Sequence, residues 1–279
     1  MQNRTMSNQK VIFLDIDGTL TDFGGKIPES AKKALTLAKQ AGHRLVVCTG
    51  RSRYQISEEI RSLPFDGMIG GAGAFVIADG KELFHHYIKP EPRKRLISYL
   101  EENKFFYTVQ TDVGTLINNR CHKQAERVYR EIMELTEKQR ADLEGKLMVR
   151  EDIVNYEKSE KVVYQMAPFT VAQVQKDLAP DFSVTDMSFK QTERNCGEIG
   201  IAGINKATGM QAYLSHVGQT KEDAIAFGDS ANDMEMIDFA ACGVAMGNAI
   251  EALKARADMV ADAVDEDGIY KAFLKLQLI

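Results

Sequence analysis

The sequence predicts an α/β protein with a doubly wound parallel-sheet (Rossmann-like) core and an inserted α+β cap domain. Three observations lead to this fold class. Short apolar runs alternate with amphipathic helical segments in the first part of the chain. The same alternation returns after about residue 224, and the stretch between has longer polar helical segments and strands of alternating polarity. We therefore expect a first core part at residues 1–83, the cap at 84–187 and a second core part at 188–279.

Composition limits the possible partners. The 279 residues are 44% hydrophobic and 27% charged, as in soluble globular proteins. The net charge of −5 argues against nucleic acid as a partner, because binding to a phosphate backbone needs a basic face. The first ten residues lack an apolar signal-peptide core, no apolar run is long enough to span a membrane, and the four cysteines are scattered without metal-ligand spacing. We expect a cytoplasmic protein without a membrane partner, and nothing in the sequence indicates its oligomeric state.

The first part reads as strand, helix, strand, helix and two further short strands. The strand at 11–14 is continuously apolar, and the helix after Pro28 has apolar residues at helical spacing up to Gly42, which ends it. A second strand at 45–48 leads to a helix that Pro64 ends, and short strands follow at 68–69 and 75–77. Apolar strands alternating with helices predict a parallel sheet covered on both faces.

The middle part reads as a separate module with an antiparallel sheet. Segments 105–109 and 115–117 resemble paired strands around a turn at 112–114. Further strand-like runs at 162–166 and 182–185 flank a helix that ends near Leu178. Another helix has an apolar stripe formed by Ala125, Val128, Ile132 and Leu135.

The last part returns to the pattern of the first. The apolar strand at 224–227 is followed by Gly228-Asp229-Ser230-Ala231-Asn232-Asp233 and then by a helix with Met234, Ile237 and Ala241. Another strand at 244–246 ends at Gly247-Asn248.

Polar residues follow several of these predicted strands. Asp15 and Asp17 follow the first strand, and alternation would put both carboxylates on one side, unless the chain turns and one residue offers its carbonyl. Either arrangement offers two oxygen ligands to Mg²⁺. The alternative without a functional site is a strand followed by an acidic turn, since Asp and Gly are common in turns. Thr49-Gly50 and the segment Asp229–Asp233 also lie at strand ends, and ligands bind at the carboxyl ends of such strands. With Lys206, these groups could neutralise and hold a phosphate monoester during in-line attack.

Four motifs in order resemble those of the haloacid dehalogenase superfamily, in particular its Cof-type sugar-phosphate phosphatase branch with a large α/β cap. They are the segments 15–20 (DIDGTL), 47–51 (VCTGR), 203–209 (GINKATG) and 228–236 (GDSANDMEM). The resemblance covers nearly the whole chain, from Val11 to Asp267-Gly268. Two departures stand out: relatives often have Ser-Asn-Gly-Ala where this chain has Gly71-Ala72-Gly73-Ala74, and Ser230 replaces a common glycine.

The resemblance implies a role for each motif. Asp15 would attack phosphorus and form an aspartyl-phosphate, and Asp17 would protonate the leaving alcohol and then activate water. Mg²⁺ would be held by the carboxylates of Asp15 and Asp229 and by the backbone carbonyl of Asp17, with Asp233 orienting the metal waters or Lys206. Thr49 and Lys206 complete the catalytic group. The residues implied in phosphate binding are Ile16, Thr49, Gly50, Lys206 and Asn232.

Each assignment has a structural alternative. Thr49-Gly50-Arg51 could be only a helix cap, Lys206 a surface lysine, and Asp233 an acidic residue that complements a helix dipole. Arg51 and Arg53 could assist phosphate binding or be solvated charges on a helix.

The sequence as a whole predicts a magnesium-dependent phosphatase for small phosphorylated metabolites, such as sugar phosphates. Selectivity is expected around Gln110–Asn118 of the cap. A phosphotransferase resembling the mutases remains open, because it shares every motif. A non-catalytic metabolite sensor also remains open, although the intact Asp15/Asp17 pair argues against it.

Overall fold

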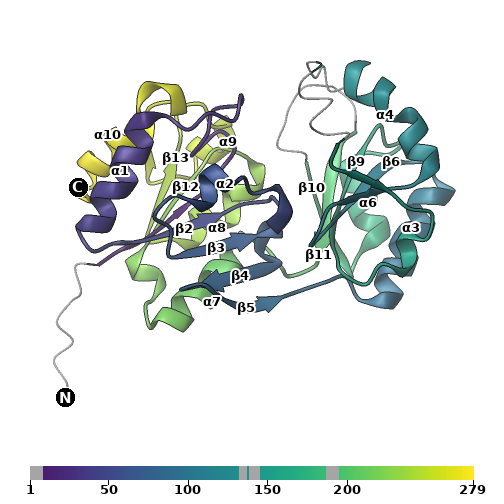
Figure 1. Ribbon diagram of the computed structural model, residues 1–279, viewed down its shortest axis with the longest axis horizontal. Helices are drawn as coiled ribbons and strands as arrows, with labels where there is room; N and C mark the ends of the chain where they lie inside the picture. The colour runs from purple at the N-terminus through teal and green to yellow at the C-terminus, as the bar shows by residue number, and fades with distance from the viewer. Residues whose placement is uncertain (1–8, 132–136, 138–144, 187–194) are drawn as a thin grey trace. The chain divides into compact units, whose positions relative to one another are not determined.

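The computed structural model describes residues 9–131, 137, 145–186 and 195–279, and the chain divides into two compact units (Figure 1). The first unit contains the residues up to Arg51, Ile56–His85 and Asn205–Ile279. The second unit contains Ser52–Gln55 and His86–Ile204. The sequence placed the second boundary after residue 187, whereas the structure extends the second unit to Ile204. The reason is β11 (Gly197–Ile201), which pairs with two strands of the second unit.

The first unit is built on an eight-stranded sheet in the order β14-β13-β12-β1-β2-β3-β4-β5. Neighbours from β14 to β3 are parallel, which confirms a doubly wound core. β4 and β5 are antiparallel additions at one edge, where the sequence analysis expected only parallel strands. The strands are β1 (Val11–Leu14), β2 (Arg44–Cys48), β3 (Gly67–Gly70), β4 (Phe75–Ala78), β5 (Lys81–His85), β12 (Ala224–Gly228), β13 (Cys242–Ala245) and β14 (Met259–Val260).

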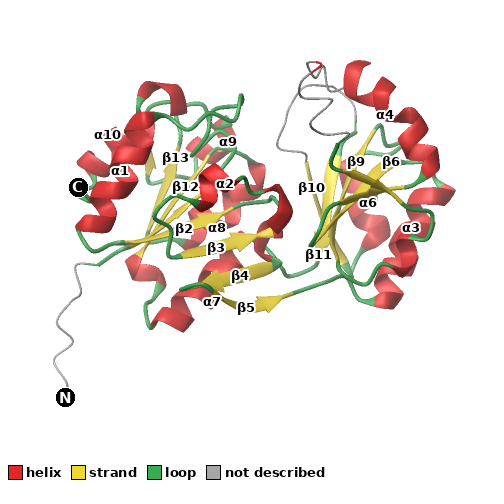
Figure 2. Cartoon of the chain, viewed as in Figure 1, coloured by secondary structure: helices red, strands yellow, loops and turns green. Residues whose placement is uncertain are grey.

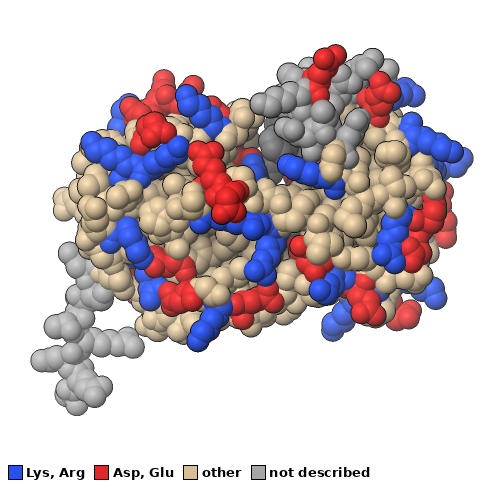
Figure 3. Space-filling model, viewed as in Figure 1, with Lys and Arg blue, Asp and Glu red and all other residues tan. Residues whose placement is uncertain are grey.

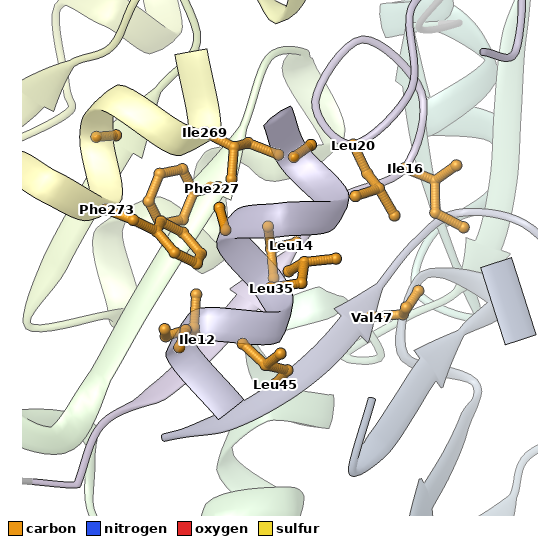
Figure 4. Close-up of a cluster of buried hydrophobic side chains, with 14 of the residues drawn as sticks. Ile12, Leu14, Ile16, Leu20, Leu35, Leu45, Val47, Phe227, Ile269 and Phe273 are labelled. Carbon is orange, nitrogen blue, oxygen red and sulfur yellow. The ribbon is translucent and has the colours of Figure 1, made fainter. Parts of the chain in front are cut away.

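Helices cover both faces of this sheet (Figure 2). Alternation along β1 explains why: Ile12 and Leu14 join one core cluster, and Val11 and Phe13 join the other. Figure 4 shows the first cluster, in which strand side chains pack against Leu35, Ile269 and Phe273. The helices are α1 (Glu29–Gln40), α2 (Glu58–Arg61), α7 (Lys206–Val217), α8 (Met234–Phe239), α9 (Glu251–Lys254) and α10 (Gly268–Lys275).

The second unit has a six-stranded sheet in the order β10-β11-β9-β6-β7-β8. All neighbours are antiparallel except β7 and β8, so the expected antiparallel sheet is in fact mixed. The remaining strands are β6 (Phe106–Thr111), β7 (Thr115–Ile117), β8 (Leu147–Val149), β9 (Ser159–Gln165) and β10 (Phe182–Asp186). The helices are α3 (Pro90–Glu102), α4 (Asn119–Glu131) and α6 (Val171–Leu178). Ala125 and Val128 of the predicted stripe are buried, and Ile132 and Leu135 lie outside the described residues.

The surface shows no segregation of charge on the face drawn in Figure 3, where basic and acidic side chains lie among one another. Within the part of the chain that the structure describes, no helix combines the length and the apolar character needed to cross a membrane.

Candidate active site

The parallel register brings three predicted loops to one edge of the first unit's sheet. Leu14 of β1 is paired with Val47 of β2 on one side and with Phe227 of β12 on the other. Asp15 is the next residue after Leu14, so it lies between the ends of β2 and β12. Its N–H donates to the carbonyl of Phe227 at 3.0 Å. The loops that contain Thr49 and Asp229 therefore begin beside Asp15.

The turn after Asp15 depends on Gly18. Its φ of +80° is unfavourable for other residues, and a Cβ there would lie 2.4 Å from Oδ2 of Asp229. The turn is tied to neighbouring loops by Thr19, whose hydroxyl donates to Oδ1 of Asp229 at 3.0 Å, and by Asn248, whose amide donates to the Gly18 carbonyl at 2.7 Å. Neither Thr19 nor Asn248 was assigned from the sequence, although Asn248 lies just beyond the predicted strand at 244–246.

Lys206 is the first residue of α7, and its side chain is completely buried. Asn205 caps this helix, since its side chain accepts from the N–H of Thr208 and the hydroxyl of Thr208 accepts from the N–H of Asn205. A cation at a helix N-terminus opposes the helix dipole, so this position requires compensating negative charge. The alternative of a surface lysine is therefore wrong.

Two carboxylates supply that charge. Nζ of Lys206 lies 2.6 Å from Oδ1 of Asp15, and it also donates to Oδ1 of Asp233. The second oxygen of Asp233 accepts the backbone N–H groups of Asp229 and Ser230, each at 3.0 Å. Asp233 therefore holds both Lys206 and the loop after β12, which is more than complementing a helix dipole.

Asp15, Asp229 and Asp233 form a buried acidic triad. One carboxylate oxygen of each lies within 4.8 Å of the others. When ionised, these three groups and Lys206 leave an excess of two negative charges. Burial raises the pKa of Asp15 to about 7, although the positive charge of Lys206 acts to lower it. Burial and the negative charges of Asp233 and Asp15 raise the pKa of Asp229 to about 8.

The charge and chemistry of this triad suit a divalent cation. Hard carboxylate oxygens are the ligands that Mg²⁺ prefers, and two positive charges would balance the excess. Asp233 already uses both oxygens on donors of the chain, which leaves Asp15 and Asp229 as the better ligands. The sequence-based assignment of Mg²⁺ to Asp15 and Asp229 stays a prediction.

Thr49 is buried at the end of β2, where its N–H donates to the carbonyl of Ile69. Its hydroxyl accepts the N–H of Arg51 at 3.2 Å, and its carbonyl accepts the N–H of Ala72 at 3.0 Å. The predicted second helix does not begin here, because α2 starts only at Glu58. Thr49-Gly50-Arg51 is thus a loop fixed by its neighbours, rather than the cap of a long helix.

The segment 71–74, which departs from the family pattern, packs directly against the start of α7. Gly73 has a φ of +102°, and a Cβ there would lie 2.1 Å from the carbonyl oxygen of Asn205. The N–H groups of Ala72 and Gly71 donate hydrogen bonds to the carbonyls of Thr49 and Arg51. The segment therefore connects the loop after β2 to Asn205, the residue before Lys206. We infer from these contacts that its small residues serve close packing.

Asp17 and Arg51 form a fork-shaped ion pair. Nε of Arg51 lies 2.8 Å from Oδ2 of Asp17, and a terminal nitrogen of Arg51 lies 2.6 Å from Oδ1. The Asp17 carboxylate is not a member of the acidic triad. Arg51 is therefore not simply solvated, and its guanidinium contacts the expected acid–base residue.

The remaining predicted phosphate ligands lie on the same loops. Ile16 is fully buried, and its carbonyl accepts N–H groups from Leu20 and Thr21. Asn232 is partly exposed and accepts from the hydroxyl of Ser230 through Oδ1, which orients its amide nitrogen away from that contact. Gly50 is partly exposed between Thr49 and Arg51. Their binding of phosphate stays a prediction.

The predicted selectivity segment 110–118 lies in the second unit. It includes the end of β6, a tight turn in which the Thr111 hydroxyl donates to the Gly114 carbonyl, and all of β7. Asp112 accepts from the Tyr156 hydroxyl and pairs with Lys158. These contacts define the segment's shape, and its part in selectivity stays a prediction.

A family model described as haloacid dehalogenase-like hydrolase matches residues 12–273. The chain belongs to this family. The phosphatase YitU of Bacillus subtilis (strain 168), named for 5-amino-6-(5-phospho-D-ribitylamino)uracil, is 30% identical over 272 residues, covering 95% of this chain and 96% of YitU. Phosphatase YwpJ of the same organism is 26% identical over 282 residues, covering 93% and 97%.

Solved structures agree with the family assignment. The structure of BT1666 from Bacteroides thetaiotaomicron, described among the phosphatases of the superfamily, has a TM-score of 0.82 and 27% identity, covering 100% of this chain and 99% of BT1666. The predicted family and fold class are confirmed, and the protein is a hydrolase by family.

Proposed function

We propose that the protein is a magnesium-dependent phosphatase that hydrolyses small phosphorylated metabolites through an aspartyl-phosphate on Asp15. The observation that supports this most strongly is the buried arrangement of Asp15, Lys206 and Asp233 beside Asp229. Burying three carboxylates around one lysine is costly for stability, so a role in chemistry is the natural explanation.

In the first step Asp15 attacks phosphorus. The ion pair with Lys206 favours the ionised form of Asp15 against the effect of burial and fixes one of its oxygens, while the other remains for attack. As the new Asp15–phosphorus bond forms, the bond from phosphorus to the leaving oxygen breaks. Bound Mg²⁺, held by Asp15, Asp229 and the Asp17 carbonyl, would supply charge neutralisation to the phosphoryl group.

Asp17 moves the protons. It gives a proton to the leaving alcohol in the first step and takes one from water in the second, as water attacks phosphorus and releases Asp15. The buried Thr49 hydroxyl, the Gly50 N–H, Lys206 and the Asn232 amide would hold the phosphoryl oxygens through hydrogen bonds. The N–H of Ile16 would contribute one more donor.

The substrate class rests on family resemblance and on the names of relatives. YitU is named for a phosphate ester of a ribityl compound, so sugar and sugar-alcohol phosphates are the first substrates to test. Segment 110–118 of the second unit is our candidate for selecting among them.

The direct test is release of free phosphate from a panel of sugar phosphates, sugar-alcohol phosphates, nucleotides and cofactor phosphates. We expect turnover with Mg²⁺, loss of turnover with a chelator, and loss in Asp15→Asn. Asp238→Asn, which changes an exposed carboxylate on α8, is the matched control and should retain turnover.

Two outcomes would contradict the proposal. One is full activity of Asp15→Asn. The other is the absence of phosphate release from every substrate by folded protein that binds Mg²⁺, which would favour a metabolite sensor. Transfer of phosphate to a second sugar without net release would instead identify a phosphotransferase.

A further inference from the structure

The fork between Arg51 and Asp17 joins the loops that follow β1 and β2. Both carboxylate oxygens of Asp17 are engaged, at 2.8 Å by Nε and at 2.6 Å by a terminal nitrogen of Arg51. The two side chains are only 26% and 28% exposed. Two parallel hydrogen bonds fix the plane of a carboxylate, which a single contact cannot do.

The backbone of Arg51 is fixed as well. Its N–H donates to the Thr49 hydroxyl at 3.2 Å, and its carbonyl accepts the N–H of Gly71 at 2.8 Å. A Cβ on Gly70 would lie 3.0 Å from the same carbonyl, so the chain packs closely here. The guanidinium therefore starts from a rigid anchor, which makes it suitable for orienting a partner.

Two cations lie at this edge of the sheet, the fully buried Lys206 and the partly exposed Arg51, and they contact different aspartates of the site. Lys206 contacts Asp15 and Asp233, and Arg51 contacts Asp17. A carboxylate offers about four lone-pair positions, and the fork uses two of them. The other two stay available for a proton on its way to the leaving oxygen or from water.

We propose that Arg51 is a positioning residue, which holds the Asp17 carboxylate at the angle needed for proton transfer to the leaving oxygen. The proposal rests on the phosphatase function above. Arg51 donates hydrogen bonds to Asp17 and does not itself exchange the proton. A lysine at this position would keep the charge and lose the fork.

Leaving-group dependence tests this role. An alkyl phosphate needs its leaving oxygen protonated, whereas p-nitrophenyl phosphate has a leaving group that departs without a proton. kcat/KM reports only the steps up to formation of the phosphoenzyme, so the later use of Asp17 as a base does not enter. We expect Arg51→Gln to lower kcat/KM about 100-fold for the alkyl phosphate, within the range for general acid–base catalysis, and no more than about threefold for the aryl phosphate.

Four further variants make the test specific. Asp17→Asn should show the same selective loss, and adding Arg51→Gln to it should cause little further loss, because both changes remove one function. Arg51→Lys should recover only part of the alkyl-phosphate activity. Arg256→Gln is the matched control, since it removes a similar arginine–aspartate fork with Asp238 at the surface, and it should leave both substrates unaffected.

Equal losses for both substrates would overturn the proposal and would identify Arg51 as a phosphate ligand. Full activity of Arg51→Lys would also overturn it, because charge alone would then be sufficient. If Arg51→Gln does not fold, comparison of Arg51→Lys with Asp17→Asn on the two substrates still decides the question. Failure of the phosphatase proposal looks different, because the unchanged protein would then release no phosphate from either substrate.

Discussion

Lys206 and Asp233 form an ion pair in which neither side chain has any exposed surface. Asp233 joins this pair through one oxygen and accepts the backbone N–H groups of Asp229 and Ser230 through the other. A single carboxylate thus fixes both the cation and the loop after β12. Its removal would leave a buried charge and two buried N–H groups without that partner.

Asp233→Ala should therefore be strongly destabilising. We expect the free energy of unfolding to fall by about 3 kcal/mol, which is typical when one partner of a buried pair is removed. Urea-induced unfolding measures the change. Asp238→Ala on α8, the helix that begins directly after Asp233, removes an exposed carboxylate and should cost less than about 0.5 kcal/mol. Equal effects of the two substitutions would show that burial of the pair contributes nothing.

Gly18→Ala should disturb the site as well as the backbone. The new Cβ would lie 2.4 Å from the Asp229 carboxylate, at a φ of +80°. Gly25 is a matched control, because its φ of +83° is almost the same and nothing lies within 4 Å of a Cβ there. We expect Gly25→Ala to cost about 1 kcal/mol of stability with activity retained, and Gly18→Ala to cost more and to lose most activity. Indistinguishable activities would contradict the close approach of Gly18 to Asp229.

Mg²⁺ should stabilise the folded protein by binding Asp15 and Asp229. At a concentration of about 100 times Kd, a ligand specific for the folded state adds about 2.7 kcal/mol. Thermal unfolding with Mg²⁺ and with chelator measures this gain. Asp229→Asn should lose most of it, whereas Asp238→Asn should keep it. An undiminished gain in Asp229→Asn would mean that Mg²⁺ binds elsewhere.

His43 should make stability depend on pH. It is 8% exposed, accepts the N–H of Lys10 at 3.0 Å through Nδ1, and has its pKa lowered by burial. The unfolded chain binds the proton more readily, so the contribution of His43 is present above about pH 6.5 and is lost as the pH falls through the lower pKa of the folded state.

Urea-induced unfolding of His43→Gln at pH 7.5 and pH 5.5 tests this. The stability difference from the unchanged protein should shrink at the lower pH. His216→Gln, on the exposed side of α7, should leave the slope unchanged. A His43→Gln difference that grows as the pH falls would contradict the assigned direction.

The sequence predicted the core well because strand and helix periodicity there matches burial. The runs at 11–14 and 224–227 are apolar throughout, and both are central strands with helices on each face. The positions of Asp15, Thr49 and Asp229 after predicted strands also indicated that they lie close together, since the carboxyl ends of parallel strands lie at one edge of the sheet.

The features that the sequence did not predict depend on contacts between segments that are far apart in the chain. β11 reads G-E-I-G-I, a weak strand signal, and it is specified by its neighbours β9 and β10 rather than by its own residues. β4 was expected to be a parallel strand, and β5 was not predicted. A hairpin at the edge of a sheet leaves little trace in the hydrophobic periodicity of the sequence. The Arg51–Asp17 fork depends on side-chain geometry between two loops, which residue spacing does not encode.

Trapping the phosphoryl group on the protein shows whether Asp15 is the residue that carries it. Borohydride reduces an aspartyl-phosphate to homoserine, so protein quenched during turnover can be reduced, digested and examined by mass spectrometry. We predict homoserine at position 15 only when substrate and Mg²⁺ are both present. Steady turnover with homoserine at another position, or with none at position 15, would show that Asp15 is not the nucleophile.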